Sequence, residues 1–180
     1  MIKNTRKGFT LIEILIVVAI IAILASVVLV GLGPTQQAGR DARRISDLSE
    51  AQNGLELYYN KCGFYPGAVG NTTCPAVTLG ATDATAYTNA GAAIDATAFG
   101  LGVSTWPQDP SNVTPHVYSY GVSGNGTAAA TSYVLGAVLE NTNNSVFNTY
   151  MPPTSVTGDT NPAGVPCGTA KTGPNYCVSL

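Results

Sequence analysis

One acidic side chain and four cysteines are the residues of this 180-residue chain whose types and spacing suggest chemistry. Glu13 lies at the edge of the run Ile14–Leu32, which holds 19 residues and no charge. Because a charged group inside lipid costs about 2.5–3.5 kcal/mol on insertion scales, a carboxylate at this place usually has a partner. The nearby chain offers only the basic side chains of residues 1–8. Glu13 is therefore the first candidate functional residue.

The four cysteines fall into two local pairs, Cys62 with Cys74 and Cys167 with Cys177. Four cysteines allow three pairings, and the sequence does not choose among them. Sequential pairing would close loops of about a dozen residues, each worth about 2–3 kcal/mol. Since no Cys-x-x-Cys pair exists and His116 is the only histidine, we expect disulfides and not a zinc site. Disulfides predict a compartment outside the cytoplasm.

Groups suited to catalysis or nucleic-acid binding are sparse. Charged residues make up 10% of the chain, and no nucleophile, base and acid are grouped. Beyond residues 1–8, basic side chains gather at Arg40, Arg43 and Arg44, which we interpret as a solvated helix face or a contact with lipid headgroups. His116 is interpreted as a surface or edge residue. The sequence predicts neither an enzyme nor a cofactor.

The first half of the chain has the pattern of one long helix with a weak point. Nineteen apolar residues in a helix extend roughly 28 Å, about the thickness of the hydrocarbon core of a bilayer. Gly31, Gly33 and Pro34 follow, and they predict a bend, a loosening or an interruption of the helix. From Ala38 to Tyr59 apolar residues recur every three or four positions, which predicts an amphipathic helix that packs on a folded head.

The remainder predicts a small antiparallel sheet. His116–Val122 and Ser132–Leu139 have strand-like patterns, and Ser123–Gly126 between them is a turn signal. A third, weaker strand is expected near residues 145–151 or 176–180. The low-complexity segment Gly67–Thr105 is expected to be a long loop with a short helix near residues 92–99. The expected fold is α+β, with a long N-terminal helix packed on a small antiparallel sheet.

Several segments of the chain resemble those of a known protein family. Residues 7–13 read Lys-Gly-Phe-Thr-Leu-Ile-Glu and precede the apolar run, and they resemble the class III signal of type IV pilins and of the pseudopilins of type II secretion. Segments within residues 47–66, together with residues 106–110 and 118–120, resemble later segments of the same family. The resemblance implies cleavage between Gly8 and Phe9 by a prepilin peptidase and N-methylation of the Phe9 amine.

The resemblance also implies a role for the acidic residue and a division of the chain. In a filament, the Glu13 carboxylate would neutralise the Phe9 amine of a neighbouring subunit, since each charge is costly in an apolar core. The expected segments are a leader (1–8), a membrane and filament-core helix (9–33), an amphipathic helix (34–61) and a globular head (62–180). Melting of the helix near Pro34 in the filament is a hypothesis of the same kind.

By this resemblance the chain is a structural subunit that polymerises through its N-terminal helix into an extracellular type IV pilus-like filament. Its partners would be copies of itself, a prepilin peptidase, an assembly ATPase, inner-membrane platform proteins and, before assembly, the membrane. It would then be a single-pass protein of the cytoplasmic membrane, with its head outside the cytoplasm.

Two alternatives remain open: a major pseudopilin of a type II secretion system, in a periplasmic pseudopilus, and a minor tip pilin for adhesion or DNA uptake. Major pseudopilins typically end in a calcium-binding loop rich in glycine and aspartate. The tail Asn141–Leu180 holds a single acidic residue, Asp159, so we predict no metal site, although backbone and asparagine oxygens leave calcium possible. This difference favours a pilus subunit over a pseudopilin.

Overall fold

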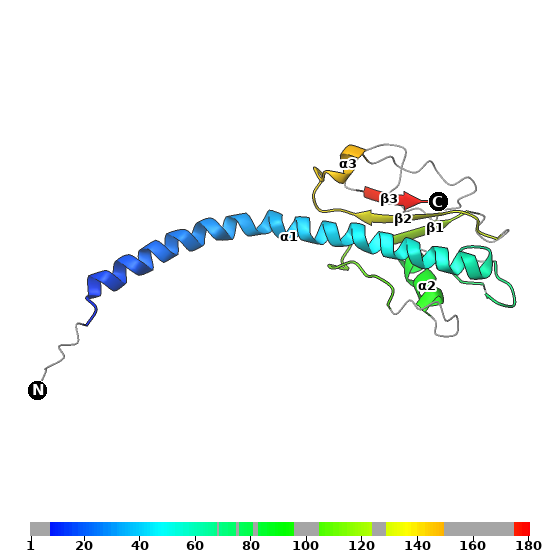
Figure 1. The fold of residues 1–180 in the computed structure, drawn as a ribbon, viewed down its shortest axis with the longest axis horizontal. Coiled ribbons are helices and arrows are strands. Elements are labelled where there is room, and N and C mark those ends of the chain that lie inside the picture. Colours follow the sequence, from blue (N-terminus) through cyan, green and yellow to red (C-terminus); the bar gives the residue numbers. More distant parts are fainter. Residues whose placement is uncertain are drawn as a thin grey trace, which may run out of the picture. The chain divides into compact units, whose positions relative to one another are not determined.

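The computed structural model describes residues 8–67, 69–74, 76–80, 83–95, 105–123, 129–149 and 175–180. It divides into two compact units, Met1–Gln37 and Ala38–Leu180. Helix α1, Leu11–Cys62, contributes its first part to one unit and its second part to the other. Figure 1 gives the order of the elements along the chain.

The described part of the first unit is mainly an apolar helix with exposed side chains. The large hydrophobic residues from Phe9 to Val28 are all exposed, and Phe9 itself is 85% exposed. By length and composition, α1 is the one helix among the described residues that could cross a membrane. Such exposure is costly in water, so this surface favours an apolar environment.

The predicted interruption at Gly31, Gly33 and Pro34 is absent, because the backbone of α1 stays helical through all three positions. Proline removes a single hydrogen bond to the carbonyl four residues earlier, and apolar spanning helices tolerate that loss by small local adjustments. The predicted interruption is therefore wrong for the isolated chain, whereas a bend or a loosening at these residues stays a prediction. Melting inside a filament stays a prediction.

Three antiparallel strands form the sheet of the second unit in the order β1-β2-β3. They are β1 Ser119–Val122, β2 Tyr133–Val138 and β3 Asn175–Ser179. Ser119 pairs with Gly136 across the first ladder. The predicted hairpin and the predicted strand near residues 176–180 are confirmed. The α+β fold class, with its long N-terminal helix, is confirmed as well.

Two local predictions differ from the structure. The strand considered at residues 145–151 is wrong, because Val146–Thr149 form the short helix α3. Asn144 explains the difference: its side-chain oxygen accepts the Val146 N–H at 3.1 Å and starts a turn. The short helix expected near residues 92–99 begins earlier, since α2 spans Asp83–Asp95. Residues 96–99 lie outside the described residues.

The core of the second unit lies between α1, α2 and the sheet (Figure 1). From Leu48 onward, helix α1 buries the stripe that its three- and four-residue spacing predicted, whereas Ala38 and Ala42 of the predicted stripe are exposed. The apolar residues of this stripe include Leu48, Ala51, Leu55 and Tyr58. The Trp106 side chain packs between the two helices, against a glycine of each. A Cβ atom built on Gly54 would lie 3.0 Å from Trp106 Cζ3, and one on Gly91 would lie 2.2 Å from Trp106 Cδ1.

The end of α1 is fixed by a glycine and a disulfide. Gly63 has a φ of 79°, and its N–H donates to the Tyr59 carbonyl at 2.7 Å, so it ends the helix as predicted. Cys62 and Cys74 form a disulfide with their Cα atoms 5.8 Å apart. Cys177 is also disulfide-bonded, while Cys167 lies outside the described residues.

Candidate functional site

The first candidate site is a polar cluster at the start of α1. The Thr10 N–H and the Thr10 hydroxyl each donate to Glu13 Oε2 at 2.8 Å, and the Glu13 N–H donates to Thr10 Oγ1 at 3.3 Å. This reciprocal arrangement is a capping box, in which a threonine before the helix and a glutamate three residues later satisfy each other's free N–H groups.

The capping box corrects our expectation that the nearby chain offers Glu13 no partner except basic side chains. The signal was present in the sequence as Thr-x-x-Glu directly before an apolar run. Thr10 therefore gives the carboxylate a neutral partner within its own chain. The hydrogen bonds do not neutralise the charge, so an ion pair with another chain is still chemically open to Glu13.

Gly8 and Phe9 immediately precede this cluster, and both are exposed. A Cβ atom built on Gly8 would have no atom within 4 Å. The folded chain therefore sets no steric requirement for glycine at this position. Any requirement for a small residue there must come from a molecule that reads the sequence.

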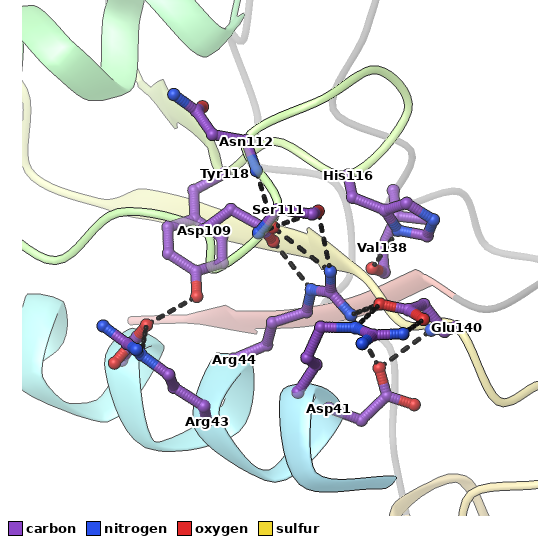
Figure 2. A network of polar contacts seen from close by, with 12 residues as sticks. Asp41, Arg43, Arg44, Asp109, Ser111, Asn112, His116, Tyr118, Val138 and Glu140 are labelled. Atoms are coloured by element: carbon purple, nitrogen blue, oxygen red, sulfur yellow. Dashed lines mark hydrogen bonds and ion pairs between the residues drawn. The ribbon is translucent and has the colours of Figure 1, made fainter. Parts of the chain in front are cut away.

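The second candidate site is a buried ion network centred on Arg44 of α1 (Figure 2). The Arg44 side chain is 0% exposed. Its Nε donates to Asp109 Oδ2 at 2.7 Å, and its Nη1 donates to Asp41 Oδ1 at 2.9 Å and to Glu140 Oε1 at 2.8 Å. Three carboxylates from three parts of the chain thus share one guanidinium, which can donate five hydrogen bonds in a fixed plane.

A second arginine completes the network at its rim. Arg40 donates through Nε and Nη2 to the two oxygens of Glu140, at 2.7 and 2.5 Å. The Glu140 side chain is 13% exposed. The hydrogen bond from Arg40, followed by that from Arg44, lowers the pKa of Glu140 from 4.5 to about 2. Glu140 is therefore ionised at any ordinary pH.

Asp109 and Asp41 also hold backbone groups. Asp109 Oδ1 accepts the N–H groups of Ser111 and Asn112, at 2.8 and 3.2 Å. Burial would raise the pKa of Asp109, but the hydrogen bonds from Arg44, Ser111 and the backbone lower it overall. Asp41 accepts the N–H groups of Glu140 and Asn141, at 2.8 and 2.9 Å.

The network corrects our interpretation of the three arginines. We expected Arg40, Arg43 and Arg44 to form a solvated or lipid-facing group, yet only Arg43 is largely exposed, at 65%. Arg43 makes a looser ion pair with Asp47, at 3.7 Å. Helical spacing could not separate these roles, because the partners of Arg44 outside α1 lie 65 and 96 residues away in sequence.

Polar contacts continue along α1 from the network. The Tyr118 hydroxyl donates to Asp47 at 2.7 Å, and the Tyr65 hydroxyl donates to Glu56 at 3.0 Å. Burial, the main cause, raises the pKa of Tyr133 to about 12, and its hydroxyl donates to Glu56 at 3.4 Å. His116 Nδ1 lies 3.0 Å from the Val138 carbonyl, at the end of β2.

In the part of the chain that the structure describes, both sites consist of side chains that hydrogen-bond to each other and to backbone groups. Among the described residues, no group of three or more histidine, cysteine, aspartate or glutamate residues is placed to hold a metal ion. In the Arg44 network, the carboxylates instead bind guanidinium groups and backbone N–H groups. The arrangement is suited to fixing structure.

Comparison with known proteins bears on the N-terminal site. Residues 3–29 match the family model described as the prokaryotic N-terminal methylation motif. The chain thus carries a prepilin-type methylation motif. The matched residues include Gly8, Phe9, the capping box of Thr10 and Glu13, and most of the apolar run.

Three curated proteins named type II secretion system core protein G are similar to part of the chain. The protein of Aeromonas hydrophila is 33% identical over 64 residues, which is 36% of this chain and 45% of the relative. That of Escherichia coli K12 is 34% identical over 63 residues, 35% and 43% of the two chains, and that of Vibrio cholerae is 35% identical over 66 residues, 36% and 45%. The chain spans just under half the length of these relatives. No solved structure matches.

Proposed function

We propose that this protein is a structural subunit that polymerises through its N-terminal helix into a type IV pilus-like filament on the cell surface. The observation that carries the proposal is the methylation motif, followed by an apolar helix with exposed side chains. Before assembly that helix is embedded in the cytoplasmic membrane. After assembly it is surrounded by the helices of other subunits, which remove the same apolar surface from water.

Assembly in this proposal begins with cleavage between Gly8 and Phe9 by a prepilin peptidase. Cleavage creates a new amine at Phe9, which is methylated and stays positively charged. The Glu13 carboxylate of a neighbouring subunit then neutralises this amine within the apolar core. Because both charges are costly there, the pairing favours the single register in which they meet. An assembly ATPase and platform proteins of the inner membrane supply the work.

A second candidate function is that of a major pseudopilin in a periplasmic filament. The names of the three relatives, type II secretion system core protein G, favour it. The two functions share processing, methylation and the helical core, and they differ in where the filament ends. Filaments sheared from the outer surface of native cells support the pilus, whereas loss of a secreted protein after gene deletion supports the pseudopilus.

The charge-pairing step is tested by Glu13→Ala in the native cell, with Glu50→Ala as the matched control. Glu50 is an exposed glutamate on the same helix and lies outside the apolar run. We expect both variants to be cleaved, and only Glu13→Ala to lose filaments, because it leaves the Phe9 amine unpaired. Processing is followed by mass spectrometry, and filament yield by the quantity of protein in the sheared fraction. Normal filament yield from Glu13→Ala refutes the charge-pairing role.

A further inference from the structure

The Arg44 network joins two loops that lie at one end of the β1–β2 hairpin. These are the Asp109 loop, residues 109–112, before β1, and the Glu140 loop, residues 140–144, after β2. Ser119, the first residue of β1, pairs with Gly136 near the end of β2, so antiparallel pairing brings the two loops to the same end. Figure 2 shows both loops beside α1.

Arg44 bonds to both loops at once. Its Nε and Nη2 donate to Asp109, its Nη2 also donates to Ser111 Oγ at 3.1 Å, and its Nη1 donates to Glu140. Asp41, which shares Nη1, accepts two N–H groups of the Glu140 loop. Each loop is therefore held on α1 by contacts that use the same guanidinium.

Shared contacts of this kind are not independent of each other. If one loop leaves, Arg44 and the carboxylates that stay lose part of their charge compensation, and any of these charges that is still buried is strongly unfavourable without its partner. The contacts that hold the second loop on α1 are then weaker. We propose that the Arg44 network is a single latch, so that the Asp109 loop and the Glu140 loop leave α1 together and not separately.

The latch is a conformational device of the head, and it does not depend on whether the chain polymerises. Opening it would free the base of the hairpin while leaving the ladder between β1 and β2 intact. The contacts of Tyr65 and Tyr133 with Glu56 tie the head to α1 at other positions. Local opening of one part of a domain while the rest stays folded is common in proteins.

Amide hydrogen exchange of the full chain in detergent micelles, followed by NMR, tests the latch. The variant is Glu140→Gln, which removes a charge from the Glu140 loop without altering any residue of the Asp109 loop. We expect exchange at the Ser111 and Asn112 amides to quicken on the order of tenfold or more. Leu135, in the centre of the sheet, is the internal reference. Glu50→Gln, the same change at an exposed site, should alter none of these rates.

The reciprocal variant, Asp109→Asn, should quicken exchange at the Glu140 and Asn141 amides by a similar factor. The proposal is overturned if Glu140→Gln quickens exchange only within its own loop and leaves Ser111 and Asn112 at wild-type rates. If Leu135 quickens equally, the whole head is opening, and a double-mutant cycle of these two substitutions on the free energy of unfolding decides. Non-additive effects support the latch, and additive effects overturn it.

Discussion

The packing of Trp106 between two helices yields the sharpest prediction about stability. The perturbation is Gly91→Ala in α2, which adds one methyl group to a buried helix face. That methyl carbon would lie 2.2, 2.3 and 2.6 Å from Trp106 Cδ1, Cγ and Nε1. Distances below 3.0 Å are not tolerated between such atoms, so either the indole or α2 must move by about an ångström.

The indole has little room to move. On its other side a Cβ atom at Gly54 would already lie 3.0 Å from Cζ3, and the Tyr87 ring centroid is 5.2 Å from that of Trp106. Overpacking of this kind costs about 1–3 kcal/mol, and the severity of the clash points to the upper end. Alanine is favoured over glycine in a helix by about 1 kcal/mol, which offsets part of the cost. We expect Gly91→Ala to lower the free energy of unfolding by about 2 kcal/mol.

Trp106 is the single tryptophan of the chain, so its fluorescence during urea unfolding reports on this site directly. The control is Gly39→Ala in α1, where an added Cβ would have no atom within 4 Å. That substitution should leave stability unchanged or raise it by up to about 1 kcal/mol. If Gly91→Ala proves as stable as the wild type, with an unchanged emission maximum, the packing argument is refuted.

Three further predictions concern the ion network and processing. Arg44→Met should lower the free energy of unfolding by about 3–5 kcal/mol, because it leaves buried carboxylates unpaired. Arg43→Met, at the exposed neighbour, should change it by no more than about 0.5 kcal/mol. Urea unfolding measures both, and equal effects of the two substitutions would contradict the prediction. Since the folded-state pKa of Glu140 is lowered from 4.5 to about 2, its contribution to stability should be complete above pH 4.5 and lost as the pH falls towards 2. A urea midpoint that Glu140→Gln does not change at pH 7 would contradict this. Gly8→Val should block cleavage in the native cell, and a processed variant in the mass spectrum would count against recognition of that glycine.

Much of the fold followed from local patterns. Apolar spacing placed the buried face of α1 from Leu48 onward, because helical periodicity depends on residues that are close together in sequence. It failed nearer the start of the head, where Ala38 and Ala42 are exposed. The turn signal between the two hairpin strands is equally local, and so is Gly63 at the helix end. Where a competing local signal was overlooked, the expectation failed. The side chain of Asn144 starts the turn that becomes α3, and Thr10 caps α1 with Glu13.

Local sequence patterns could not predict the ion network around Arg44. Nothing around Arg44 distinguishes it from Arg43, its exposed neighbour, because the difference arises from carboxylates that the fold brings from far along the chain. The sequence marks Asp109 only as part of a family-like segment, and no local pattern marks Glu140. A charge that pairs across long sequence distances can be assigned only when the packing of the helix against the head is known.

The proposed function requires that this chain is cleaved and methylated before it assembles through its apolar helix. The most direct test is mass spectrometry of the N-terminal peptide of filaments sheared from native cells. The account predicts a peptide that begins at Phe9 and carries one methyl group on its amine. A peptide that still begins at Met1, or filaments that lack this chain, would contradict it.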